Sequence, residues 1–230
     1  MHPDQLSPVA QDYLKVIWTR TEWGADPMTT GDLAEHFGTS AANVTETLKR
    51  LDAQGLVERV PYKPVALTEV GLRCAVAMVR RHRLLETYLV EKLGYGWHEV
   101  HDEAERLEHA VSDDFVSRID EALGHPTADP HGDPIPDAGH RSSHPADALP
   151  LAAVQAAGAY RVLRVSDADP AVLQRARELG VVPGAELEIG PGGGQDGTRA
   201  VRPPGGAPLA VGAELAGATL VVPIVVPVAG

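Results

Sequence analysis

The sequence has one cysteine, few aromatic residues and no long apolar run. The single Cys74 excludes an internal disulfide and a zinc finger built on several thiolates. Aromatic residues make up only 4% of the chain, so its cores must be built from Leu, Val, Ile and Ala. No apolar run approaches the roughly 20 residues that span a bilayer, and no basic segment followed by an apolar stretch marks the N-terminus for export. We therefore expect a cytoplasmic protein with no membrane partner.

The charge is strongly negative and unevenly distributed. The 230 residues carry a formal net charge of -12, yet the stretch through Arg83 is close to neutral, so the acidic excess lies after it. A chain of this length suits two or three modest domains. A near-neutral first part can bind DNA if its basic side chains gather on one face. The acidic remainder would attract divalent cations.

A helix-turn-helix pattern lies near the N-terminus. Residues 8–22 have apolar side chains at helical spacing, and Ser7 is a suitable N-cap. Residues 29–57 then contain two short amphipathic segments, each followed by a glycine. Thr30 can cap the first segment, and Ser40 can start the second. Two short helices joined by a tight glycine-containing turn are typical of a helix-turn-helix.

The following elements extend this pattern. Residues 56–67 read as two β-rich runs around a Pro-Tyr-Lys-Pro tip, which indicates a hairpin, and Thr68 opens a long helix to about Leu93. A helix-turn-helix followed by a hairpin predicts a winged helix. A further helical segment is expected over residues 98–123, with an interruption near Ser112.

The last part of the chain differs in kind. Residues 124–150 are rich in Pro, Gly, Asp and His, which predicts an ordered turn and then a flexible linker. Within residues 151–228 we expect a small β-barrel-like module: a strand at 162–165, a short helix at 170–179 and several further strands.

The most informative motif is H-D-E-A-E-R-L-E-H, residues 101–109. Side chains three and four apart share one face of a helix. Four possible ligands are therefore expected on one side: His101, Glu105, Glu108 and His109. His82 and Glu86 repeat the same spacing earlier. One His/Glu pair is common on solvated helices, but two pairs on neighbouring helices favour a metal site, and carboxylates with imidazole and no thiolate suit Mn(II) or Fe(II).

These residues resemble those of a known family. The sequences Q-D-Y-L-K-V-I-W, V-R-R-H-R-L-L-E, V-H-D-E-A-E-R-L-E-H-A-V-S-D and D-P-H-G-D-P-I-P are similar to those of the diphtheria toxin repressor family, especially its manganese-responsive members. The final E-L-G-V-V-P-G-A resembles an SH3-like module of the iron-transport-accessory type. The resemblance covers nearly the whole chain.

The resemblance implies a mainly α fold with a small β module. The expected order is a winged helix-turn-helix DNA-binding domain (1–73), a helical metal-binding and dimerisation domain (74–140), a linker (141–150) and an SH3-like β-barrel (151–230).

By position, the resemblance implies a primary regulatory metal site. Its ligands would be Asp12, Glu105, Glu108 and His109. Iron-responsive members typically have Met and Cys at the first two positions, whereas Asp12 and Glu105 match the manganese-responsive pattern. Hard oxygen in place of sulfur lowers the relative preference for softer metals.

An ancillary site has two competing ligand sets in the family. One uses His82, Glu86 and His101 with ligands from the C-terminal module. The other uses Glu86 with two residues of the D-P-H-G turn, Asp129 and His131; Asp167 of the barrel is a further possible ligand. A third family arrangement, with two adjacent metals, has a glutamate at the position of Lys15. Lys15 cannot replace a carboxylate, which argues against that arrangement.

The DNA contacts are expected on the second helix of the helix-turn-helix and on the wing. Ala42 could touch a thymine methyl group, and Glu46 could accept a hydrogen bond from cytosine. Further contacts, mainly to phosphate, are assigned to Ser40, Asn43, Thr45, Lys49, Arg50, Tyr62 and Lys63. Family members bind palindromic double-stranded operators as homodimers.

The sequence thus predicts a Mn(II)-dependent repressor of metal-uptake genes, with Co(II) or Zn(II) as substitutes in vitro. An Fe(II)-dependent repressor of the same family is the nearest alternative. A metal-dependent hydrolase is a rival from another class, but the chain has no H-E-x-x-H motif. A metal-buffering protein without DNA binding is a third reading. We expect no enzyme activity.

Overall fold

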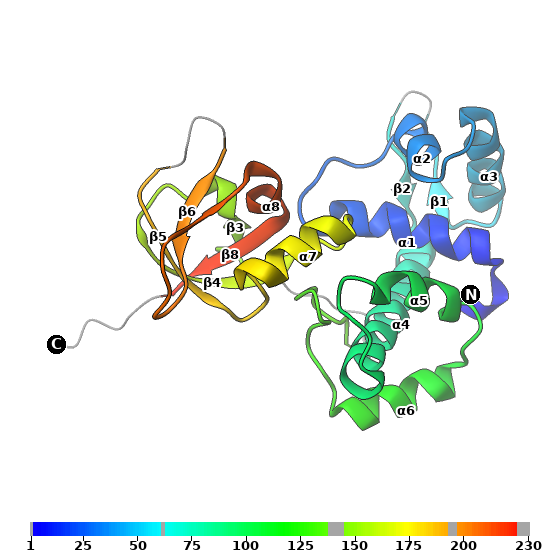
Figure 1. The fold of residues 1–230 in the computed structure, drawn as a ribbon. Helices are drawn as coiled ribbons and strands as arrows, with labels where there is room; N and C mark the ends of the chain where they lie inside the picture. The colour runs from blue at the N-terminus through cyan, green and yellow to red at the C-terminus, as the bar shows by residue number, and fades with distance from the viewer. Residues whose placement is uncertain (1, 61–62, 138–144, 193–196, 225–230) are drawn as a thin grey trace. The chain divides into compact units, whose positions relative to one another are not determined.

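The computed structural model describes residues 2–60, 63–137, 145–192 and 197–224 (Figure 1). The chain forms two compact units. The first comprises residues 1–82, 107–112 and 136–141, and the second comprises 83–106, 113–135 and 142–230. None of the helices in the described ranges combines the length and the apolar composition needed to cross a membrane.

The first unit contains a winged helix. Its elements in chain order are η1 (Pro3–Gln5), α1 (Pro8–Glu22), α2 (Thr30–His36), α3 (Ala41–Ala53), β1 (Val57–Glu58) and β2 (Ala66–Leu67). The two strands pair antiparallel, with Val57 opposite Leu67. The predicted helix-turn-helix and hairpin are therefore present, while the Tyr62 end of the hairpin tip lies outside the described residues.

Hydroxyl and carboxylate caps place the helix starts. Ser7 accepts a hydrogen bond from the backbone N–H of Ala10 at the start of α1, as expected. The cap of α2 is Thr29 and not Thr30, because Thr29 and Asp32 form a reciprocal capping box. Ser40 caps α3, as the sequence predicted.

A leucine-rich core supports the winged helix, which the sequence predicts to be the DNA-binding head of the chain. Leu14, Leu33, Leu48 and Leu56 are completely buried in one cluster. Cys74 belongs to the same cluster, where it packs as a small apolar side chain.

Three further helices follow. They are α4 (Glu69–Leu93), α5 (Val100–Leu107) and α6 (Asp113–Leu123). Thr68 accepts from the Gly71 N–H where α4 begins. The expectation that one helix holds residues 101–109 is wrong at its end, because α5 stops at Leu107. The chain then turns, with the Ala110 and Val111 N–H groups both donating to the Leu107 carbonyl.

The second unit ends in a six-stranded antiparallel sheet of order β3-β8-β4-β5-β6-β7. Its elements are β3 (Leu149–Pro150), η2 (Leu151–Ala153), β4 (Gly158–Val165), α7 (Pro170–Leu179), β5 (Glu186–Ile189), β6 (Arg199–Arg202), β7 (Leu209–Val211), α8 (Ala213–Ala218) and β8 (Thr219–Pro223). The predicted strand at 162–165 and helix at 170–179 are both found. β3 begins inside the stretch that the sequence assigned to a linker.

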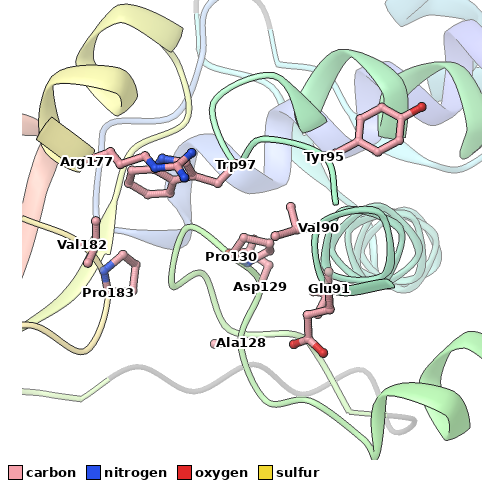
Figure 2. A pocket seen from close by; sticks show the side chains of 11 residues that line it. Val90, Glu91, Tyr95, Trp97, Ala128, Asp129, Pro130, Arg177, Val182 and Pro183 are labelled. Carbon is pink, nitrogen blue, oxygen red and sulfur yellow. The ribbon is translucent and has the colours of Figure 1, made fainter. Parts of the chain in front are cut away.

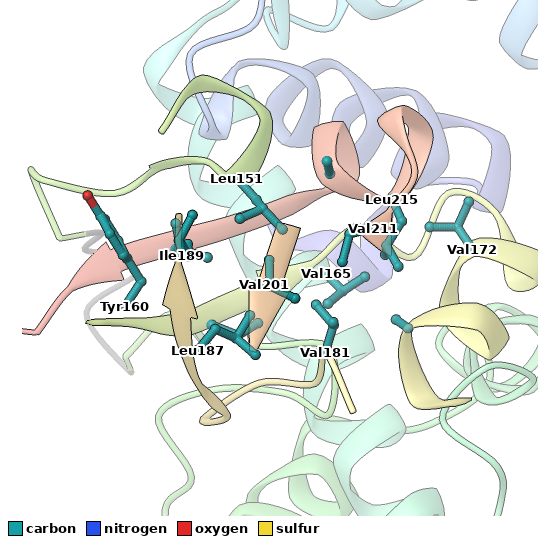
Figure 3. Packing of buried hydrophobic residues seen from close by; sticks show 14 of the residues in the cluster. Leu151, Tyr160, Val165, Val172, Val181, Leu187, Ile189, Val201, Val211 and Leu215 are labelled. Carbon is teal, nitrogen blue, oxygen red and sulfur yellow. The ribbon is translucent and has the colours of Figure 1, made fainter. Parts of the chain in front are cut away.

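Aliphatic side chains fill the space inside this sheet. Leu151, Val165 and Leu187 converge there with Val211 of β7 and Leu215 of α8 (Figure 3). All five are almost completely buried. Burial of a whole Leu or Val side chain contributes about 1.5–3 kcal/mol, so this aliphatic core is sufficient for a module with few aromatics.

A loop from the acidic part of the chain lies against β4. The Val165 N–H donates to the His131 carbonyl at 2.9 Å. Gly132 has a φ of +91°, and a Cβ at this position would come within 2.0 Å of the Leu163 carbonyl oxygen. Only glycine permits this close approach, so the loop over residues 127–135 is fixed against the strand.

Candidate metal centres and DNA-binding face

A first cluster of ligand-type side chains lies in the first unit. It joins Asp12 of α1 to Glu108 and His109, which follow α5, and one ligand atom from each lies within 4.8 Å of the others. The His109 Nε2 is 2.9 Å from Asp12 Oδ1 and 3.7 Å from Glu108 Oε1. Glu108 is completely buried, whereas Asp12 and His109 are partly exposed. We call these three residues the first cluster.

Gln11 orients the imidazole of His109. The Gln11 amide donates from Nε2 to the Pro3 carbonyl at 2.8 Å, so its Oε1 is the atom that faces His109. That oxygen can only accept, so the His109 Nδ1–H donates to it at 2.6 Å. Nε2 is left facing the carboxylates, where a bound ion would take the place of its proton.

The buried carboxylate of Glu108 has two cationic or polar partners. Lys15 Nζ lies 2.6 Å from Oε1, and His82 Nδ1 lies 2.6 Å from Oε2. Burial by itself raises the pKa of Glu108, but His82 and Lys15 outweigh it and hold that pKa below its usual value. Glu108 is therefore a carboxylate, available as a hard anionic ligand.

A second cluster lies wholly within the second unit. Its members are Glu86 of α4, His101 of α5, Asp129 and His131 of the loop, and Asp167 after β4. His101 Nδ1 is 3.2 Å from Glu86 Oε1 and 3.3 Å from Asp167 Oδ2. Ligand atoms of Glu86, Asp129 and His131 lie within 4.8 Å of one another. We call these five residues the second cluster.

Trp97 orients His131 in the way that Gln11 orients His109. The His131 Nε2 lies 2.5 Å from the Trp97 carbonyl oxygen, which can only accept, so Nε2 carries the proton. Nδ1 faces Glu86 Oε2 at 3.8 Å, which is too long for a hydrogen bond. His131 and Glu86 are both completely buried, and a cation between the two atoms would contact both of them.

The carboxylates of the second cluster raise the pKa values of the groups that surround them. Burial, Asp133 and Glu86 raise the pKa of Asp129 to about 8. Burial lowers the pKa of His131, but Glu86 and Asp129 outweigh it and raise that pKa to about 10. His101 behaves alike: Asp167 and Glu86 overcome burial and raise its pKa to about 11. Carboxylates that attract protons this strongly also favour a divalent cation.

The loop that carries Asp129 is held on both sides. Asp129 Oδ1 accepts from the backbone N–H groups of His131 and Asp133. Arg83 lies 3.6 Å from Asp133, and Arg164 of β4 approaches the same carboxylate at 2.8 Å. The loop thus presents Asp129 and His131 on a rigid backbone.

A pocket of about 430 Å³ borders the second cluster (Figure 2). Val90 and Glu91 of α4 lie on one side of it and Arg177, Val182 and Pro183 on the other; Asp129 and Pro130 are also in its wall. Asp129, a buried member of the second cluster, therefore lines this pocket.

The predicted ligands are only partly grouped as expected. Of the four primary ligands, Asp12, Glu108 and His109 meet in the first unit. Glu105 belongs to the second unit, where its Oε1 is 3.6 Å from His101 Nε2. His82, expected in the ancillary site, bonds Glu108 of the first cluster and also lies within 4.8 Å of Glu86, its expected ancillary partner on the same helix.

The two competing ancillary sets share one location. Glu86, which both sets share, forms the second cluster with His101 of one set, Asp129 and His131 of the other, and Asp167 of the barrel. Both clusters offer carboxylate and imidazole, and neither contains sulfur among the described residues. Such donor sets fit a hard first-row divalent ion.

The exposed face of α3 carries most of the predicted DNA contacts. Val44, Thr47, Leu48 and Leu51 bury one side of the helix. The other side exposes the predicted residues Ala42, Asn43, Glu46, Lys49 and Arg50, with Ser40 at the N-cap and Thr45 partly exposed. On the wing Lys63 is exposed, and Tyr62 lies outside the described residues.

Three functional contacts were missed from the sequence: Gln11, Lys15 as a partner of Glu108, and the Trp97 carbonyl. Gln11 and Lys15 flank Asp12 at positions i−1 and i+3, and helical spacing places Lys15 on the same face as Asp12. That spacing was the one available signal. The Trp97 contact is made by a backbone atom from a loop, so no sequence pattern could identify it.

Comparison with known proteins gives consistent matches along the chain. Residues 5–65 match the profile described as "Iron dependent repressor, N-terminal DNA binding domain", and residues 68–137 match "Iron dependent repressor, metal binding and dimerisation domain". Residues 149–223 match the FeoA domain. The "Iron-dependent repressor IdeR" of Mycobacterium tuberculosis is 33% identical over 204 residues, which is 83% of this chain and 88% of that protein. The chain belongs to the diphtheria toxin repressor family. The β module is the SH3-like domain of this family, and the whole fold is that of a metal-dependent transcriptional repressor.

Other relatives have names that do not mention iron. The "Diphtheria toxin repressor" of Corynebacterium glutamicum is 32% identical over 193 residues, covering 80% of this chain and 84% of its own length. A structure named "Manganese-dependent transcriptional repressor complex with manganese" is 47% identical, with a TM-score of 0.88 over 94% of this chain and all of its own. The manganese-activated repressor ScaR, in its apo form, is 31% identical, with a TM-score of 0.79 over 93% of this chain and all of its own. The family is one of DNA-binding regulators with a dimerisation domain.

Proposed function

We propose that this chain is a Mn(II)-dependent repressor of metal-uptake genes. The observation that carries the proposal is the donor set of the first cluster, in which Asp12 offers a carboxylate beside Glu108 and His109. The only cysteine of the chain, Cys74, is buried in the leucine-rich core and belongs to neither the first nor the second cluster of ligand-type side chains. Hard oxygen donors with imidazole favour Mn(II) over softer metals relative to a sulfur-containing site. The 47% identical structure that is named for manganese supports the same assignment.

The regulatory step follows from where the ligands originate. Asp12 projects from α1, which packs in the core of the DNA-binding head, whereas Glu108 and His109 come from the turn after α5. A divalent ion bound there would supply the positive charge that keeps both carboxylates together. The residues of the first cluster would then hold α1 to that turn, and Glu105, one helical turn before Glu108, is proposed as the fourth ligand. DNA affinity rises because the held arrangement is the one that fits the operator.

The second cluster is proposed as an ancillary metal site of the second unit. Glu86, Asp129 and His131 would form its buried part, with His101 and Asp167 as further ligands. The 3.8 Å separation of His131 Nδ1 from Glu86 Oε2 supports this, because an ion that replaced the Nδ1 proton there would contact an imidazole nitrogen and a carboxylate together.

We assign operator recognition to α3 and the wing of a homodimer on double-stranded DNA. Ala42 and Glu46 would contact bases. The remaining residues would mainly contact the DNA phosphates and so position the protein on the duplex: Ser40, Asn43, Thr45, Lys49, Arg50, Tyr62 and Lys63. A symmetric dimer places two α3 helices on half-sites that are one helical turn, or a multiple of it, apart.

The proposal is tested by a titration of operator binding with buffered metals. Labelled promoter fragments of the host's metal-transport genes would be titrated at fixed free Mn(II), Fe(II), Co(II) or Zn(II), with Fe(II) handled without oxygen. We expect Mn(II) to induce operator binding at a free-ion concentration equal to or below the one at which Fe(II) induces it. A chelator should reverse the binding. Fe(II) lies above Mn(II) in the general affinity order, so such a result would reflect the site itself. Binding induced only by Fe(II) would support the iron-dependent alternative, which the 33% identity to the iron-dependent repressor favours. Operator binding that responds to no metal would contradict both the Mn(II)-dependent and the Fe(II)-dependent assignment.

A further inference from the structure

Lys15 occupies a position in the first cluster that the proposed function does not use. Its ammonium lies 2.6 Å from Glu108 Oε1, and its side chain is 8% exposed beside a carboxylate that is fully buried. Lys15 follows Asp12 by three residues on α1, so both side chains leave the same face of that helix. We propose that Lys15 is a built-in cation that competes with the divalent ion for Glu108 and so sets the metal concentration to which the chain responds. This inference rests on the first cluster being the regulatory metal site.

The competition concerns one atom. Glu108 Oε2 is held by His82 Nδ1 at 2.6 Å, so Oε1 is the oxygen that faces His109, at 3.7 Å from its Nε2. An ion bound by His109 and Glu108 must therefore approach Oε1, which Lys15 already contacts. An ammonium and a divalent ion repel each other at such distances, so metal binding displaces Lys15 from this oxygen.

Lys15 also has a role when metal is absent. A buried carboxylate without a cation is strongly destabilising, and Lys15 supplies that cation to Glu108. Its removal should therefore have two effects of opposite sign: a less stable metal-free protein and a tighter metal site. If Lys15 were purely structural, its removal would still make the metal-free protein less stable. The affinity of the site for metal would then stay the same or become weaker.

The test compares the full-length wild type with Lys15→Met, which keeps the length of the side chain and removes its charge. Mn(II) binding is measured by calorimetry, and the first-cluster event is identified as the one that Asp12→Ala removes. We expect the dissociation constant of that event to fall by about tenfold or more, because a unit charge within 4–6 Å of a carboxylate shifts its proton affinity by about 1–3 pKa units. The unfolding temperature of the metal-free variant should fall, and Mn(II) should raise it by more than it raises that of the wild type.

Two variants serve as controls. Lys15→Arg keeps a cation, so its dissociation constant should remain within about threefold of the wild type. Arg81 is also buried, but it donates to the Glu108 backbone carbonyl at 3.1 Å and its side chain pairs with Asp4. Arg81→Met should therefore lower stability without a comparable gain in Mn(II) affinity.

The wild type offers a measurement that does not depend on any variant folding. Reductive methylation followed by mass spectrometry reports the reactivity of each lysine. Without metal, buried Lys15 should react more slowly than the exposed Lys49 and Lys92. Saturating Mn(II) should increase the rate at Lys15 and leave the other two unchanged.

The outcomes separate this inference from the proposed function. If wild-type protein binds no Mn(II) at the first cluster, the proposed function fails. If it binds Mn(II), but Lys15→Met binds no more tightly or the reactivity of Lys15 is unaffected by metal, the competition is refuted while the metal site stands.

Discussion

At the scale of single residues, two histidines of the clusters, His109 and His131, have one arrangement in common. His109 donates through Nδ1 to the Gln11 side chain, and His131 donates through Nε2 to the Trp97 carbonyl. In each case an oxygen of the protein accepts a hydrogen bond from one ring nitrogen, and the other ring nitrogen faces carboxylates. This fixes the orientation of each ring before any ion arrives, which lowers the cost of metal binding.

Gln11→Leu tests that arrangement. The variant removes the acceptor for the His109 Nδ1–H, so the ring is no longer held in its ligating tautomer. We expect about 10- to 100-fold weaker Mn(II) binding at the first cluster, measured by calorimetry. Gln11→Glu keeps an acceptor oxygen and should retain most of the affinity. Equal losses in both variants would argue that Gln11 acts only through the packing of α1.

The residue chemistry of the clusters was predictable in part. Glu108 and His109 were identified by residue type and helical spacing, Asp12 was identified by the family resemblance, and the structure brings the three together. The role of Gln11 depends on its bond to the Pro3 carbonyl, and the role of Lys15 on a partner 93 positions away. Spacing on one helix cannot reveal a long-range partner.

At the scale of elements, helix periodicity identified most of the structure but not where each helix stops. Residues 101–109 were expected on one helix, yet α5 ends at Leu107. Glu108 turns into the interior and pairs with Lys15 and His82, a tertiary contact that a local pattern does not contain. The cap of α2 shows the same limit, because Thr29 and Thr30 are both good caps and the capping box with Asp32 decides between them.

The loop over residues 127–135 should be sensitive to a single added methyl group. Gly132→Ala places a Cβ against the Leu163 carbonyl and strains a backbone with φ of +91°, so we expect a loss of about 2 kcal/mol or more in the free energy of unfolding. Metal bound by the second cluster should be lost while the first cluster still binds. Gly124→Ala is the matched control, since its φ is +74° but no atom lies within 4 Å of its Cβ. Similar effects of the two substitutions on metal stoichiometry, measured by equilibrium dialysis, would contradict the proposed close approach.

At the scale of the whole molecule, the order of parts could be predicted from the sequence alone. Winged helix, ligand-bearing helices and a small β module appear in the expected order, because each has its own periodicity and turn signals. The second cluster could not be assembled in this way. It draws on α4, α5, a loop and the segment after β4, and only the fold brings these four places together.

The central claim is that the first cluster couples Mn(II) to operator binding through Asp12. The most direct measurement is the buffered Mn(II) titration of operator binding by Asp12→Ala beside the wild type, with circular dichroism and metal-free unfolding as checks that the variant is folded. We expect the variant to keep its fold and to need at least about 100-fold more free Mn(II), or not to respond at all, because α1 has lost its ligand. If the variant binds the operator at the wild-type Mn(II) concentration, Asp12 does not couple the metal to DNA binding.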